Sequence, residues 1–164
     1  MTPFVVVGES APDSDSSKWP NAGFGAVTPD FFKTFGVRMM KGRAFTEQDS
    51  PSNVKVAIVN EEFVRRFLNG ADPLRARVWL RQSAEDRRIP AAPTEWQIVG
   101  VSHDTLSKSM REHVPEIQIP FWQGPSSGPV IAVRTARDPD STIKSIGAAV
   151  HSVDSAAILT RPRP

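Results

Sequence analysis

Four short segments decide the fold of this chain, and they read Val27-Thr-Pro-Asp-Phe-Phe-Lys-Thr-Phe-Gly36, Gly42-Arg-Ala-Phe-Thr-Glu-Gln-Asp49, Val56-Ala-Ile-Val-Asn-Glu-Glu-Phe-Val-Arg-Arg66 and Gly70-Ala-Asp-Pro-Leu-Arg-Ala-Arg77. The first segment predicts a helix. Thr28 is a candidate N-cap, because its hydroxyl can accept a free backbone N–H, and Pro29 suits the first helical position. Gly36 can end this helix in the left-handed conformation.

The third segment predicts a strand followed by a helix. Residues 57–59 are short, apolar and partly β-branched, which favours a buried strand. Asn60 can cap the helix that follows, the two glutamates after it favour the positive helix end, and Gly70 can close it. We expect Phe31, Phe35, Val59, Phe63 and Phe67 to be largely buried, because they lie on the apolar faces of these elements.

The order of the segments resembles the extracytoplasmic core domain of bacterial ABC-transporter permeases of the macrolide-exporter type, a group that includes FtsX-like permeases. That family has a "V-(S/T)-P-x-(F/Y)-F-x-T-(F/L)-G" helix, then "GR-x-F-T-x-x-D", "V-x-I-V-N-E-x-(F/A)-x-R-R" and "G-x-D-P-(I/L)-G-x-R". Further matches here are residues 96–101, 115–120 and 133–139, so the resemblance covers roughly residues 20–160. Arg75 stands where the family usually has glycine, which predicts a differently built turn after Pro73.

The resemblance implies an α+β domain with two lobes. A mixed β-α-β (porter-like) lobe would comprise residues 1–22 and 95–160, a smaller inserted α+β lobe residues 23–94, and residues 161–164 a tail. It implies no enzyme activity and no cofactor. The domain would couple the motion of membrane helices to a substrate or partner protein outside the membrane. It would stand on the periplasmic side of the bacterial inner membrane.

The same resemblance implies partners. A cytoplasmic ATPase subunit or domain would act through membrane helices that are missing from this chain. An extracytoplasmic adaptor or substrate protein is expected, and a dimeric full-length protein. The alternative is an independent soluble module that binds peptide or lipid, and a small enzyme is a third class. Membrane helices in the same reading frame, beside an ATPase gene, would separate the first two.

Composition limits the remaining functions. The 164 residues suit one domain, with 20 Lys+Arg against 18 Asp+Glu, so the pI of 9.3 reflects a small excess of positive charge. A strong nucleic-acid binder usually shows a larger excess. The chain has no cysteine, which excludes disulfides and thiol chemistry. No run approaches the ~18 apolar residues that span a bilayer.

The second half predicts a separate group of strands and one helix. Strands are expected at residues 97–101, 116–119 and 130–134, and a closing strand at 156–159. Asp138 and Pro139 mark a helix start. The residues at helical spacing that form its apolar stripe are Ile143, Ile146, Val150 and Val153.

Catalytic and metal sites find little support in the sequence. His103 and Asp104 are adjacent, so their side chains are expected to point apart, and no nucleophile motif is present. The three histidines are too widely spaced for a typical zinc site, in which two ligands usually lie within about five residues of each other. No Gly-rich loop with Lys-Ser/Thr precedes a helix, so we expect no nucleotide binding.

A dense set of cationic residues is the candidate partner interface. It lies on a predicted strand and the loop after it, where Trp79 is expected on the outward face. The candidate residues are Arg75, Arg77, Trp79, Arg81, Arg87 and Arg88. An acidic partner or anionic lipid would suit them, whereas nearby acids, Glu85 and Asp86 among them, favour an ordinary solvated surface.

Overall fold

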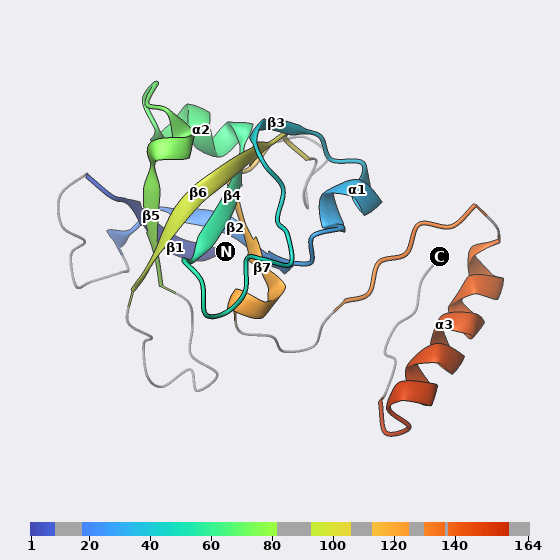
Figure 1. Cartoon of the computed structure of the whole chain (residues 1–164). Coiled ribbons are helices and arrows are strands. Elements are labelled where there is room, and N and C mark those ends of the chain that lie inside the picture. The colour runs from blue at the N-terminus through green and yellow to red at the C-terminus, as the bar shows by residue number, and fades with distance from the viewer. Residues whose placement is uncertain (9–17, 82–92, 106–112, 125–129, 137, 158–164) are drawn as a thin grey trace. The chain divides into compact units, whose positions relative to one another are not determined.

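The computed structural model describes residues 1–8, 18–81, 93–105, 113–124, 130–136 and 138–157 of the chain (Figure 1). Two compact units are present, Met1–Val130 and Ile131–Pro164. The first contains the strands and the shorter helices, and the second contains the longest helix. No helix among the described residues has the length and apolar character that a membrane crossing requires.

The described part of the first unit consists of strands, two short α-helices and two 3-10 helices. They are β1 (Thr2–Val6), β2 (Asn21–Val27), α1 (Phe31–Phe35), β3 (Met39–Gly42), β4 (Val56–Asn60), α2 (Glu61–Phe67), η2 (Pro73–Arg75), β5 (Arg77–Leu80), β6 (Thr94–Ser102), β7 (Glu116–Pro120) and η3 (Phe121–Gln123). The second unit contains α3 (Pro139–Val153). The strands at 56–60, 94–102 and 116–120 contain the strands that the sequence predicts at 57–59, 97–101 and 116–119.

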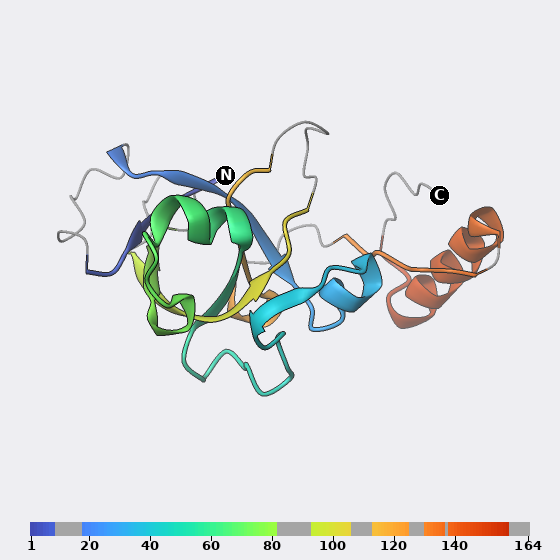
Figure 2. The same ribbon diagram turned by 90° about the horizontal axis from the view of Figure 1, so that it is seen from above.

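The strands form one sheet that closes on itself. The strand order is β3-β6-β4-β7-β2-β1-β5, and β5 also pairs with β6. Six strands therefore form a ring, β6-β4-β7-β2-β1-β5, in which the last joins the first. Figure 2 looks down on this ring, and α2 lies over one open end of it. Two of the pairings are parallel, β2 with β7 and β4 with β6, and the others are antiparallel.

The long strand β6 pairs with two different strands along one of its edges. Its first half pairs with β5, with Val78 opposite Trp96, and its last residues pair with β3, with Gly42 opposite Gly100. The other edge of β6 pairs with β4. Within the described part of the chain, β3 therefore pairs on one side only, whereas β5 has hydrogen-bonded neighbours on both sides.

The core fills the inside of the ring. Phe4, Phe63 and Trp96 are buried at 0%, 0% and 1% exposure. The ring of Phe4 lies 4.9 Å from that of Phe63 and 4.8 Å from that of Phe67, so β1 and α2 meet through an aromatic cluster. A second, smaller core lies beneath α1, where Phe32 and Phe45 are buried.

Helix α2 begins as its sequence predicts. The Asn60 side chain accepts the Phe63 backbone N–H at 3.0 Å and also the Glu116 backbone N–H at 2.8 Å, so one amide caps the helix and fastens β7. Leu68 is the C-cap, and Asn69 and Gly70 follow with φ of 45° and 84°. Gly70 thus lies beyond the helix end rather than at it.

Helix α1 differs from its prediction at the start. The N-cap is Asp30, which makes no side-chain cap, while the Thr28 carbonyl accepts the Phe31 N–H at 3.0 Å in a turn. The prediction of a Thr28 cap is wrong, because this turn comes first and places the N-cap two residues later, at Asp30. Gly36 ends α1 with φ of 69°, as predicted. Phe35 is 54% exposed, so its predicted burial is wrong, because a helix of five residues covers only one face.

The second unit contains the predicted helix but no strand among its described residues. Asp138 caps α3 by accepting the Ser141 N–H at 3.0 Å, and Pro139 takes the first position. Residues 130–134 form no strand, so the predicted strand there is wrong: no described strand pairs with them. Of the predicted closing strand at 156–159, Ala156 and Ala157 are not in a strand, and residues 158–159 lie outside the described residues.

The proposed lobe boundaries fall within the closed sheet. Strands from residues 23–94 and from the flanking segments pair with one another, and the compact units divide at residue 130. The arrangement in two lobes, with its tail at 161–164, therefore stays a prediction.

Candidate functional site

Strand β5 carries the predicted cationic surface, and its main chain is fully engaged. Phe4 to Val6 pair with it on one side and residues 94–97 on the other. Val78 and Leu80 are buried inside the ring, so the alternation of a strand points Arg77 and Trp79 outward. A partner could therefore reach β5 only through outward side chains and not by adding a strand.

The charges of this surface are largely satisfied within the protein. Arg77 donates to Glu95 at 2.9 Å, and Arg75, whose side chain is 90% exposed, lies 3.8 Å from Asp72. The Arg81 guanidinium lies over the Trp19 ring, 5.4 Å from its centroid. Arg87 and Arg88 lie outside the described residues. The three described arginines, Arg75, Arg77 and Arg81, therefore do not act as one free cationic patch.

Trp79 is the apolar centre of this surface. It is half-buried and is paired in register with Val5 of β1 on one side and Glu95 of β6 on the other. Val5 is also half-buried, and Val7, just after β1, is 38% exposed. The outer face of β1 and β5 thus presents an apolar strip beside the Arg77–Glu95 ion pair, and we call it the β1–β5 face.

The segment from Gly42 to Asp49 is a structural clamp. Arg43 donates two hydrogen bonds to the Asp49 carboxylate, at 2.7 and 2.8 Å, and the Thr46 backbone N–H donates a third at 2.8 Å. Trp122 donates to the Asp49 carbonyl at 2.6 Å. The Gln123 side chain, 6% exposed, bridges the Val56 N–H and the Ser50 carbonyl. This motif therefore anchors the loop 43–55 against η3.

The ion pair between Arg43 and Asp49 leads us to expect that the protein loses stability in acid. Hydrogen bonds from Arg43 lower the pKa of Asp49 below its usual range, and those from Arg65 and Arg66 lower the pKa of Glu62. A carboxyl whose pKa is lower in the folded state than in the unfolded state stabilises the fold at pH values above its unfolded pKa, which is ~4. This stabilisation is lost as the pH falls through the folded pKa. The melting temperature should therefore fall below about pH 4–5, and this fall should be shallower in Asp49→Asn.

Thermal melts between pH 7 and pH 2.5 measure this effect. Asp49→Asn should already lose about 1–3 kcal/mol at pH 7, because a charged hydrogen-bond acceptor is removed. Asp30→Asn changes an exposed carboxylate that caps nothing and should keep the wild-type curve. An Asp49→Asn curve parallel to the wild type throughout would show that the clamp does not govern acid stability.

His103 and Asp104 fasten β6 to the start of α2. The His103 Nδ1 lies 2.6 Å from a Glu61 carboxylate oxygen, and Asp104 accepts the Glu62 backbone N–H at 2.8 Å. The two adjacent side chains contact different residues, in agreement with the expectation that they point apart. No group of three metal-ligating side chains occurs among the described residues.

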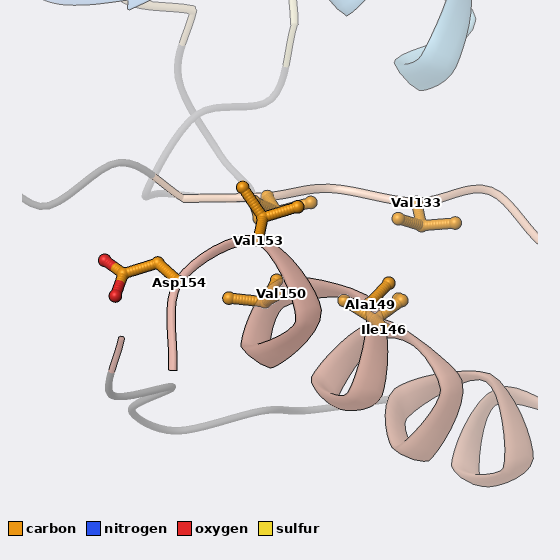
Figure 3. A pocket seen from close by; sticks show the side chains of 7 residues that line it. Val133, Ile146, Ala149, Val150, Val153 and Asp154 are labelled. Atoms are coloured by element: carbon orange, nitrogen blue, oxygen red, sulfur yellow. The ribbon is translucent and has the colours of Figure 1, made fainter. Parts of the chain in front are cut away.

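An apolar cleft of ≈ 410 Å³ lies within the second unit (Figure 3). Ile146, Val150 and Val153 from α3 face Val133, from the segment before the helix, across it. Val153 is 90% exposed, and none of the residues of α3 is buried. The predicted apolar stripe therefore exists, and Ile146, Val150 and Val153 from it line this cleft.

A second cleft, of ≈ 670 Å³, was not predicted. Residues 35–38, which join α1 to β3, line one side, and residues 103–105 line the other. Sequence reasoning assigned Phe35 to the core and so missed this surface. A signal was available in residues 31–43, which contain four cations and no carboxylate.

Comparisons with known proteins agree with the fold. The family model described as the MacB-like periplasmic core domain matches residues 1–153. The periplasmic region of MacB from Actinobacillus actinomycetemcomitans is similar in structure, with a TM-score of 0.60 and 17% identity, over 93% of this chain and 63% of that one. A domain of a permease protein from Porphyromonas gingivalis gives a TM-score of 0.54 and 17% identity, over 99% of this chain and 74% of that one. A comparison with curated protein sequences returned no match.

Proposed function

The chain belongs to the MacB-like periplasmic core domain family, and we propose that it works as a non-catalytic coupling domain of an ABC-transporter permease. In this role it receives motion from membrane helices and passes it to a substrate or partner protein outside the membrane. The observation that carries the proposal is the family match over residues 1–153. The chain spans 63% of the length of the MacB periplasmic region, so the activity and partners of a whole protein are part of the proposal.

The closed sheet suits a part that transmits motion. Every strand of the ring is hydrogen-bonded on both sides, and α2 packs its aromatic residues onto the interior. Displacing one strand would break two ladders and open a close-packed core, and such a core transmits strain rather than absorbing it. The first unit should therefore move as one body between two arrangements, as in hinge and shear transitions.

The proposed setting follows from the family. The domain would stand on the periplasmic side of the inner membrane, in a dimeric permease driven by a cytoplasmic ATPase subunit or domain. An extracytoplasmic adaptor or substrate protein would contact it. We place this contact on the β1–β5 face, where Trp79 and Val5 form an apolar strip and Arg75 is exposed. Arg77, Arg81, Arg87 and Arg88 complete the proposed set, and loops after a rigid strand are favoured recognition sites.

Transport assays on the full-length gene product, together with its ATPase, test this proposal. Trp79→Ala combined with Arg75→Ser should reduce transport at least severalfold, because aromatic anchors dominate protein contacts. Arg81 is left unchanged because it stacks on Trp19. The matched control is Val54→Ala, which removes a 69% exposed apolar side chain from a different loop and should leave transport unchanged.

The outcomes separate the proposals. If the double variant stays folded and transports at the wild-type rate, the β1–β5 face is an ordinary surface. A gene product that works without membrane helices or an ATPase would support the alternative, an independent binding module.

A further inference from the structure

The surface formed by α1 and β3 carries three exposed cations. Lys33, Arg38 and Lys41 are exposed and make no ion pair with any described residue. The other arginines of the unit whose ion pairs are described each face a carboxylate, and they are Arg43, Arg65, Arg66, Arg75 and Arg77. We call this region, residues 33–41 with the adjoining cleft, the α1–β3 surface.

Apolar side chains are exposed on the same surface. Phe35 is 54% exposed and Met40 is 41% exposed. Phe35 and Arg38 both line the ≈ 670 Å³ cleft, which ends at residues 103–105. The carboxylates beside the cleft contact other groups and not the three cations: Glu61 is bound to His103, and Asp104 accepts the Glu62 N–H. The cleft therefore combines an apolar wall with a cation that lacks a partner in the described part.

Strand β3 resists pairing with another strand. It has four residues, carries Lys41, ends at Gly42 and contains a register shift between Met39 and Lys41. Short length, lysine and irregular register are the features by which proteins block strand addition at an open edge. A partner on this surface would therefore be held by side chains.

We propose that the α1–β3 surface docks a protein partner through an apolar side chain flanked by carboxylates. The apolar group fits the cleft beside Phe35, and the carboxylates face Lys33, Arg38 and Lys41. A protein fits better than a lipid bilayer, because one short helix offers little apolar area to insert and weak anchors hold a membrane only marginally. A concave cleft also suits a protruding side chain. This surface is distinct from the β1–β5 face.

A titration with a synthetic probe tests the proposal. The probe is an acetylated and amidated pentapeptide, Asp-Glu-Leu-Asp-Glu, added to the isotope-labelled full chain and followed by backbone amide shifts. Shifts should concentrate at residues 33–41 and 103–105. Changing Lys33, Arg38 and Lys41 together to serine should weaken binding about tenfold, the effect of three exposed charge pairs. Replacing the leucine of the probe with glycine should weaken binding further, and salt should also weaken it.

Matched controls make the result specific. Arg134→Ser with Lys144→Ser removes two exposed charges from other surfaces and should leave the probe affinity within about twofold. Equal weakening by this control would overturn the proposal, because net charge alone would then explain binding. Absence of localised shifts would overturn it as well. Vesicles with 30% phosphatidylglycerol that bind the chain through the same three cations, when the peptide does not bind, would assign the surface to lipid.

Discussion

Phe63→Ala is expected to lower the free energy of unfolding by about 3–5 kcal/mol, as large-to-small changes in a close-packed core do. Phe63 is fully buried, and its ring centroid lies 4.9 Å from that of Phe4 and 5.3 Å from that of Phe67. The substitution leaves a cavity where α2 meets β1, a place that two separate elements would have to move to fill. Urea unfolding followed by circular dichroism measures the change.

Phe35→Ala is the matched control for this prediction. The same atoms are removed, but from a side chain that is 54% exposed at the end of α1. Its cost should stay below about 1 kcal/mol, the range of ordinary surface changes. Similar losses for the two variants would mean that α2 does not close the ring as described.

Gly42→Ala is expected to cost about 3 kcal/mol or more and to detach β3 from β6. Gly42 has φ of 66°, which costs an L-residue ~1–2 kcal/mol. A Cβ there would lie 2.2 Å from the Val99 carbonyl oxygen and 2.8 Å from a Leu74 methyl carbon. Since the carbonyl belongs to a central strand, overpacking adds ~1–3 kcal/mol. This explains why glycine begins the Gly42–Asp49 segment.

Gly70→Ala separates the two parts of that cost. Gly70 also has a positive φ, 84°, but a Cβ there would meet nothing within 4 Å. It should therefore cost only the ~1–2 kcal/mol of the backbone conformation. Amide hydrogen exchange should show faster exchange in β3 for Gly42→Ala and no change there for Gly70→Ala. Equal losses in the two variants would rule out the close contact with Val99.

Features set by neighbouring residues were predictable from the sequence. The Asn60 and Asp138 caps, the Gly36 helix end and the buried strands all depend on side chains within a few positions of each other. After Asp72, which caps it, the chain forms a 3-10 helix at Pro73–Arg75, and the difference from the turn of the family stays a prediction. The family was predictable too, because its motifs are largely these local devices.

Features set by distant residues were not predictable. Alternation along β5 showed which side chains face the core, but not that both of its edges are paired. The residues at 130–134 favour a strand by their own side chains, but a strand forms only where a second strand supplies hydrogen bonds. The candidate interface shows the same limit: the sequence showed arginines, while Glu95 and Trp19, which contact Arg77 and Arg81, come from other segments.

The closed ring also sets the order in which the chain can fold. Phe4 pairs with Leu80, and Gly23 pairs with Glu116, so the earliest strands have partners that are made late. Such distant pairings slow folding, because the entropy cost of closing a long loop comes before the stabilising contacts form. A chain emerging from one end would hold β1 and β2 without their outer partners until β5 and β7 followed. We therefore expect this unit to fold after it has emerged, in seconds rather than microseconds, and to depend during that interval on protection from aggregation.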